Sequence, residues 1–138
     1  PLGLETIAPM SSKQFFDASQ TLEPHLLKPG SLIDSQLSPV RWSDWFRHEG
    51  IAERADLGGL SFDRAALVLS AAADGLGIAL ESTRLAETEL RQGSLVVLNG
   101  HQPPLQREMH FLCYRGSMKG SRKIERFKEW IMNQIHEA

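Results

Sequence analysis

The sequence contains a single cysteine, Cys113, in 138 residues. One thiol excludes a disulfide framework within the chain and is typical of a protein in the reducing cytoplasm. Long apolar runs are also missing: the longest lies within residues 65–73 and is interrupted by Ser70, whereas a membrane-spanning helix needs about 20 residues. Residues 1–5 lack the basic and apolar stretches of a secretory signal. The sequence therefore predicts a cytoplasmic protein without a membrane partner, and its start at Pro1 indicates a fragment or a processed chain.

Net charge is low as well, because 15 Lys and Arg residues stand against 17 Asp and Glu residues, giving −2. A sequence pI near 6.2 gives no general attraction to nucleic acid, which usually requires a basic face. The apolar fraction of 41% and the charged fraction of 23% are ordinary, which indicates a soluble globular fold and excludes disorder. The length fits one domain, or one lobe with part of another.

The usual catalytic and metal-binding patterns are absent from the sequence. The histidines are scattered, and no two have the i, i+4 spacing of a zinc peptidase; they are His25, His48, His101, His110 and His136. His110 and Cys113 stand three apart on a predicted strand, so their side chains point to opposite faces and do not share a metal. No Gly-x-Ser-x-Gly motif presents a serine nucleophile. We therefore expect no catalytic residue, metal or cofactor, and we expect Cys113 to be a small buried side chain.

The most informative stretch combines an alanine-rich helix, a glycine stop and a short strand. We expect the helix over 64–73, because that run contains good helix formers and no Gly or Pro. Ser61 or Asp63 can cap its start, and Gly75 can close its end in the left-handed conformation. A buried strand is expected over 76–80. Because the glycines follow a helix end, where the partial charge is negative, they do not form a phosphate-binding loop.

Further strands and helices alternate along the chain. Strands are expected at 4–8 (closed by Pro9), 31–34, 57–62, 94–98 and 109–114, and helices at 11–18, 43–50, 83–90 and from 121 onward. This alternation predicts an α/β protein. The last helix places an apolar face toward a partner, formed by Ile124, Phe127, Ile131 and Ile135.

Trp42 and Trp45 are neighbours at i and i+3 on a predicted helix. They form either an aromatic platform for a ligand or the buried side of that helix. We favour burial, because aromatic side chains carry the largest burial energy and a small lobe needs it.

Polar side chains gather at the predicted ends of strands and the start of a helix. In open α/β sheets, ligands bind outside the carboxyl ends of strands, and the free amides of a helix start attract small anions such as carboxylates. Phe62 would add an apolar wall. The alternative is that these groups only cap helices and satisfy turns. The predicted ligand-binding residues are Ser35, Gln36, Ser61, Phe62, Asp63 and Glu81.

Three segments, in this order and spacing, carry a family resemblance: Trp42–Phe46 (WSDWF), Leu60–Asp63 (LSFD) and Ala71–Leu80 (AAADGLGIAL). They resemble the effector-binding domain of LysR-type transcriptional regulators, in the branch that includes glycine-cleavage and β-lactamase activators. The opening, Glu5–Ser12, and the closing Phe127–Ile131 resemble the same domain.

The resemblance implies a periplasmic-binding-protein-like fold of two α/β lobes, with a small effector in the cleft between them. In this family, effector binding shifts the packing of a tetramer and changes how the protein occupies DNA. Residues 1–80 would form the second lobe, and residues 81–138 the returning part of a first lobe truncated at its N-terminus. DNA would be contacted only through a helix-turn-helix domain absent from these residues. The expected effector is an amino acid or another small carboxylate.

Two further expectations concern partners. The strands and the last helix of 94–138 would expose a strand edge and an apolar helix face, and both kinds of surface promote association with another chain. We therefore expect a homodimer, formed by exchange of this segment between copies. The alternative to a regulator is a stand-alone small-molecule carrier of the periplasmic-binding type, which the missing export signal disfavours.

Overall fold

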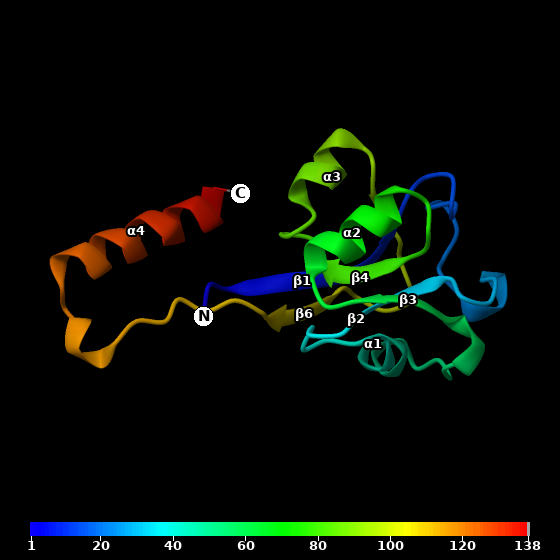
Figure 1. Cartoon of the computed structure of the whole chain (residues 1–138), viewed down its shortest axis with the longest axis horizontal. Helices are drawn as coiled ribbons and strands as arrows, with labels where there is room; N and C mark the ends of the chain where they lie inside the picture. Colours follow the sequence, from blue (N-terminus) through cyan, green and yellow to red (C-terminus); the bar gives the residue numbers. More distant parts are fainter. Residues whose placement is uncertain (138) are drawn as a thin grey trace. The chain divides into compact units, whose positions relative to one another are not determined.

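The computed structural model describes residues 1–137. The chain forms two compact units, one of residues 6–106 and one of residues 1–5 with 107–138. Figure 1 labels the elements of both units, which are described separately below. The predicted lobes 1–80 and 81–138 stay a prediction, and the larger unit spans their common boundary.

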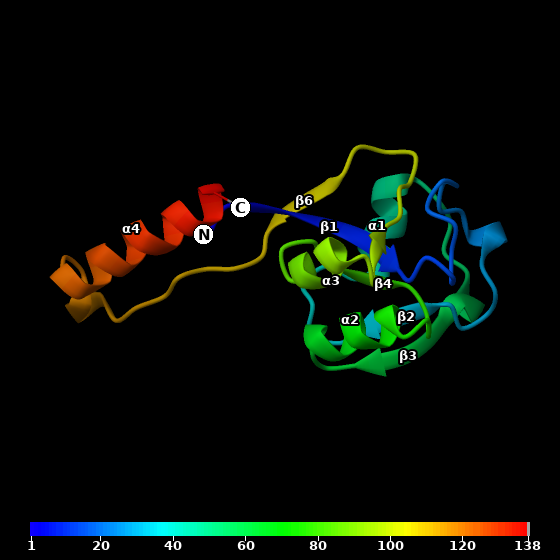
Figure 2. The ribbon, with the colours of Figure 1, turned by 90° about the horizontal axis from the view of Figure 1, so that it is seen from above.

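The larger unit is built on six strands. β1 (Leu4–Ser11) pairs antiparallel with β4 (Ala79–Ser82) and β5 (Val96–Val97), and β6 (Leu105–Glu108) also pairs with β1. β2 (Leu32–Ser35) and β3 (Gly58–Phe62) form a parallel pair. A parallel bridge between Leu32 and Ile78 places β2 beside the start of β4. The carboxyl ends of β2, β3 and β4 therefore point the same way, and Figure 2 shows β3 beyond β2 as the outermost of them.

Helices cover both sides of these strands. Figure 1 shows α2 (Ala65–Ala73) above the strands and α1 (Trp42–Glu49) below them. α2 packs against β2, β3 and β4, and α3 (Glu87–Gln92) follows β4. The core on the α2 side contains Met10, Ile33, Val68, Leu69, Ala71, Ala72, Ala79, Ala86 and Leu95. Short 3-10 turns occupy Pro24–Leu26, Ala55–Leu57 and Gly116–Met118.

α1 confirms the predicted helix and the burial of its aromatic residues. Trp42 and Trp45 are 9% and 3% exposed, and Trp42 Nε1 donates to the Ile33 carbonyl at 2.9 Å. Gly50 ends the helix with φ +68°, in the left-handed region that favours glycine. Gly75 likewise follows α2 with φ +79°, as predicted. Glycine placement and aromatic spacing were therefore sound predictors of these two helices.

Several predicted boundaries were wrong. Neither Ser61 nor Asp63 caps α2: its N-cap is Arg64 and no side chain makes a cap bond, because the Ser61 hydroxyl bonds to Asp34 of the neighbouring strand instead. β1 does not end at Pro9 but runs to Ser11, since the Pro9 carbonyl can still accept the Leu98 N–H at 2.8 Å.

The helix expected at 11–18 is absent, because Ser11 ends β1 and the residues after it form turns. Ser12 caps only one of them, through Oγ and the N–H of Phe15 at 3.3 Å. The strand expected at 76–80 lies at Ala79–Ser82, and the helix expected at 83–90 begins only at Glu87. The strand expected at 94–98 is confined to Val96–Val97.

The smaller unit contains α4 (Arg122–Glu137), which confirms the predicted last helix. The predicted strand 109–114 is wrong, because within residues 1–137 this stretch forms no ladder. Leu2 N donates to His110 O at 2.8 Å, and His110 Nδ1 lies 2.7 Å from Glu5 Oε1. Cys113, expected to be buried, is exposed because no sheet covers it. On α4, Phe127 and Trp130 are 44% and 56% exposed, with ring centroids 5.8 Å apart.

Candidate functional site

The ends of β2 and β3 bring four of the predicted site residues together. Ser35 lies opposite Phe62 in the parallel register, and Gln36 N donates to the Phe62 carbonyl at 2.9 Å. The Gln36 side chain reaches across from the end of β2, and its Nε2 donates to Ser61 Oγ at 2.8 Å. Parallel pairing thus produces a small polar surface at the strand ends, where ligands bind in open α/β sheets.

Two residues that the sequence did not single out complete this surface. Ser61 Oγ donates to Asp34 Oδ2 at 3.1 Å. Arg41 donates to the other oxygen, Asp34 Oδ1, from Nη2 at 2.6 Å and from Nε at 3.2 Å, and its Nη1 donates to the Gln36 carbonyl at 3.2 Å. The available signal was the charge of Asp34 next to the apolar Leu32 and Ile33 of the same strand.

Arg41 retains hydrogen-bonding capacity at this surface. A guanidinium carries five N–H donors, and three of them are engaged as described. Within residues 1–137, nothing accepts a bond from the remaining two, one on each terminal nitrogen. The side chain is 43% exposed, so both donors are available to a solute. A planar guanidinium with paired donors suits a carboxylate.

The other two predicted site residues, Asp63 and Glu81, differ in their exposure to solvent. Asp63 directly follows β3 and is exposed at the same end of the strands. Glu81 lies on β4 opposite Ala8 and is only 2% exposed. Asp63 is therefore open to a solute at the strand ends, whereas Glu81 is covered by the fold.

The shifted pKa values lie elsewhere in the larger unit. The side-chain hydrogen bond between Arg54 and Asp56 raises the pKa of Arg54 and lowers that of Asp56. The pKa of Asp17 is lowered by hydrogen bonds from the backbone and then the hydroxyl of Ser19. The hydrogen bonds that cause these shifts join residues two positions apart and do not involve the ends of β2 and β3.

Within the described range, no cluster of three His, Cys, Asp or Glu side chains is arranged to hold a metal ion. None of the helices in residues 1–137 is long and apolar enough to cross a membrane.

Comparison with known proteins identifies a family for nearly the whole chain. The family model described as LysR substrate binding domain matches residues 3–135. The chain is 31% identical over 137 residues to the HTH-type transcriptional regulator PerR of Escherichia coli (strain K12), covering 99% of this chain and 45% of that protein. It is 35% identical over 150 residues to the uncharacterized HTH-type transcriptional regulator y4mQ of Sinorhizobium fredii (strain NBRC 101917 / NGR234), covering 100% of this chain and 46% of that protein.

A solved structure shares the fold. The effector domain of the transcriptional regulator AmpR of Pseudomonas aeruginosa matches with a TM-score of 0.64 at 19% identity, over 98% of this chain and 64% of that one. The predicted periplasmic-binding-protein-like α/β class is thereby confirmed. The chain spans less than half the length of the two curated relatives it matches. It belongs to the LysR substrate-binding domain family.

Proposed function

We propose that this chain is the effector-sensing part of a LysR-type transcriptional regulator and binds a small carboxylate, such as an amino acid, at the ends of β2 and β3. Family membership supports the sensing role. The unused donors of Arg41 beside Gln36 and Ser61 support the ligand class. The network from Gln36 through Ser61 to Asp34 is the observation that carries the proposal, because it holds these polar groups in place before a ligand arrives.

The proposed contacts follow from the donors that remain. The ligand carboxylate accepts the two free N–H groups of Arg41 and the second N–H of Gln36 Nε2, whose first is engaged with Ser61. The half-buried ring of Phe62 provides the apolar wall for the ligand's side chain. Ser35 is buried and supports the register, and Asp63 is exposed where it can accept a bond from an ammonium group.

In the whole protein, we propose that ligand binding changes DNA occupancy by a helix-turn-helix domain outside these residues. A ligand can shift this equilibrium only by binding one conformation more tightly than another. The protein would act in the cytoplasm as a homo-oligomer, without catalysing a reaction. The names of the two curated relatives favour this role over a stand-alone binding protein.

The test is a thermal-shift screen of amino acids and small carboxylates on the full-length protein that contains this chain. A cognate ligand raises the melting temperature by mass action, because it binds only the native state. Arg41→Gln should weaken that ligand by about tenfold or more, since it removes charge-assisted hydrogen bonds.

The matched control is Arg47→Gln, on the neighbouring helix α1, where Arg47 is 78% exposed and makes only a 3.4 Å contact with Asp44. This variant should bind like the parent protein. If no carboxylate raises the melting temperature, or if both variants bind equally well, the proposal is wrong.

A further inference from the structure

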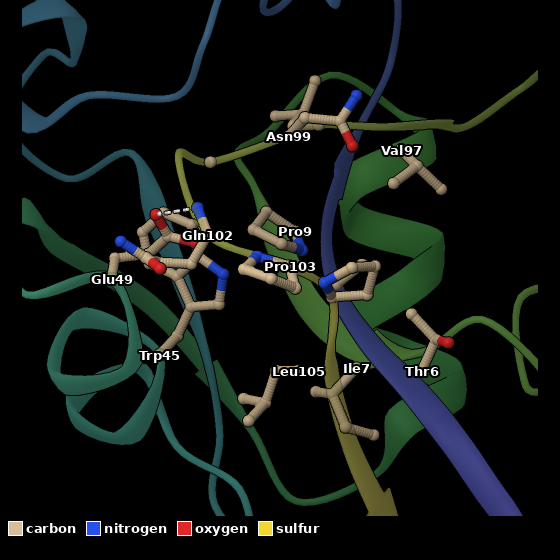
Figure 3. A pocket seen from close by; sticks show the side chains of 14 residues that line it. Thr6, Ile7, Pro9, Trp45, Glu49, Val97, Asn99, Gln102, Pro103 and Leu105 are labelled. Carbon is tan, nitrogen blue, oxygen red and sulfur yellow. Dashed lines mark hydrogen bonds between the residues drawn. The ribbon is translucent and has the colours of Figure 1, made fainter.

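We propose that a second pocket in the larger unit, separate from the strand ends, binds a small primary ammonium group. The pocket lies between β1, α1 and the segment from Val97 to Leu105. Figure 3 shows its lining side chains, among them Ile7, Pro9, Trp45, Glu49, Pro103 and Leu105. It shares no residue with the surface formed by Gln36, Ser61 and Arg41.

Glu49 supplies the acceptor of this pocket. The residue is only 7% exposed. Its Oε2 accepts two backbone N–H groups, from His101 at 2.7 Å and from Gln102 at 3.2 Å. Within residues 1–137, no group donates to Oε1. This oxygen is therefore free to accept a hydrogen bond from a ligand that carries N–H groups.

Gly100 shows how closely the chain is fitted around this carboxyl group. A Cβ at Gly100 would overlap the carboxyl carbon and both oxygens of Glu49. Any other residue at this position would therefore displace Glu49. Because Gly100 has no side chain, the loop can approach closely enough for the backbone N–H groups of His101 and Gln102 to contact the Glu49 carboxyl group.

Trp45 supplies a second polar group at the same pocket. Its indole is 3% exposed, and within the described part of the chain Nε1–H has no acceptor, whereas the neighbouring Trp42 donates to Ile33. This N–H is therefore free to donate a hydrogen bond to a ligand or to water. The pocket thus presents one unfilled acceptor and one unfilled donor among apolar walls, the usual composition of a small-molecule site.

The size of the cavity limits the ligand. Its volume is about 90 Å³, smaller than the roughly 150 Å³ cavity that accepts benzene and equal to a few water molecules. The carboxyl group selects a cation with N–H donors, because a hydrogen bond between charged groups is stronger than one between neutral groups. Asn99, Gln102 and Pro104 are exposed at the rim, so a longer substituent can extend into solvent.

The rim is fixed by three contacts, two to Leu22 and Glu23 and one to His48 of α1. Leu22 N donates to Asn99 O at 2.8 Å, and His48 Nε2 lies 2.7 Å from Pro103 O. His101 Nε2 lies 2.5 Å from Glu23 Oε1. This rim leads directly into β6, along which the chain passes to residues 107–138. An occupied pocket would therefore stiffen the segment that connects the two units.

The experiment is an NMR titration of the whole chain with ethylammonium chloride. The probe signal is the indole N–H of Trp45, assigned among the three tryptophans by its loss in Trp45→Phe. We expect a saturable shift with a dissociation constant of about 1 mM, which is near the limit for so small a ligand. Tetramethylammonium chloride at equal ionic strength has the same charge but no N–H donor, and it should give no saturable shift.

Glu49→Gln should weaken ethylammonium binding by about tenfold or more, because it removes the charge. Glu53→Gln, at an exposed carboxyl of the following loop, is the matched control and should bind normally. The proposal is overturned if ethylammonium gives no saturable shift, which means that water alone fills the pocket. Equal binding of tetramethylammonium also overturns it, and this comparison does not require any variant to fold.

Discussion

Gln36 and Ser61 are 25 positions apart in the chain, yet Nε2 of one donates to Oγ of the other at 2.8 Å. The contact exists because β2 and β3 pair in parallel, with Asp34 opposite Ser61 and Ser35 opposite Phe62. The same pairing lets Asp34 accept the Ser61 hydroxyl, so one serine joins both strand ends. This relationship positions the donors on which the proposed effector site depends.

Ser61→Ala tests that relationship. Without the hydroxyl, Gln36 loses its acceptor and Asp34 loses a donor, so the affinity for the effector should fall by about fivefold to tenfold. The surface is exposed, so the free energy of unfolding should fall by only about 1 kcal/mol or less. Calorimetric titration and urea denaturation measure the two effects. Ser70→Ala, at an exposed position of α2, should change neither affinity nor stability appreciably; an equal loss of affinity in both variants would contradict the assignment.

Gly50→Ala tests the helix stop that orients α1. Gly50 has φ +68°, and no heavy atom lies within 4 Å of an added Cβ, so the cost comes from backbone strain alone. We expect a loss of about 1–2 kcal/mol in the free energy of unfolding. Gly58→Ala is the comparison, because Gly58 is equally open but has φ −62°. A Gly58→Ala variant as unstable as Gly50→Ala would argue against the left-handed stop.

The Arg54–Asp56 pair predicts a local pH dependence. The hydrogen bond from Arg54 lowers the pKa of Asp56 from its usual 3.8. Its contribution to stability is therefore complete above 3.8 and is lost as the pH falls through the lower, folded-state pKa. NMR titration of the Asp56 carboxyl should give a midpoint below 3.8, and Arg54→Gln should raise it. The midpoint should not move in Arg64→Gln, which changes an exposed arginine that makes no contact with Asp56.

The predicted homodimer remains to be tested at the apolar face of α4. Phe127 and Trp130 are about half exposed on this helix, and such neighbouring aromatic rings favour self-association. Sedimentation at micromolar concentration should show a dimer. Replacing both residues by serine should give a monomer, whereas replacing Glu125 and His136, on the opposite side of the helix, should not. A monodisperse parent monomer would contradict the prediction, including the exchange of residues 94–138.

The elements that the sequence predicted well are specified by residues within them or directly beside them. α1 is specified by its aromatic spacing and by Gly50, and the end of α2 by Gly75. Residues 109–114 are apolar enough for a strand, but a strand also needs a partner, and none of the described residues forms a ladder with them. Local composition therefore could not decide their structure.

The candidate site was only partly predictable for a similar reason. A strand end and a helix start could be located from the pattern, and they led to Ser35 and Gln36 and to Ser61 and Phe62. The roles of Asp34 and Arg41 depend on contacts across the fold, in which Arg41 bonds to a residue seven positions away and to the Gln36 carbonyl. The cap expected from Ser61 failed because its hydroxyl has a better-placed partner in Asp34 than the amides of α2.

The most direct test is a crystal structure of the full-length protein with the carboxylate that raises its melting temperature most. The account predicts the ligand's carboxylate within hydrogen-bonding distance of the terminal nitrogens of Arg41 and of Gln36 Nε2, with Phe62 against its apolar part. Ligand density elsewhere, with the Arg41 donors still facing solvent, would contradict it.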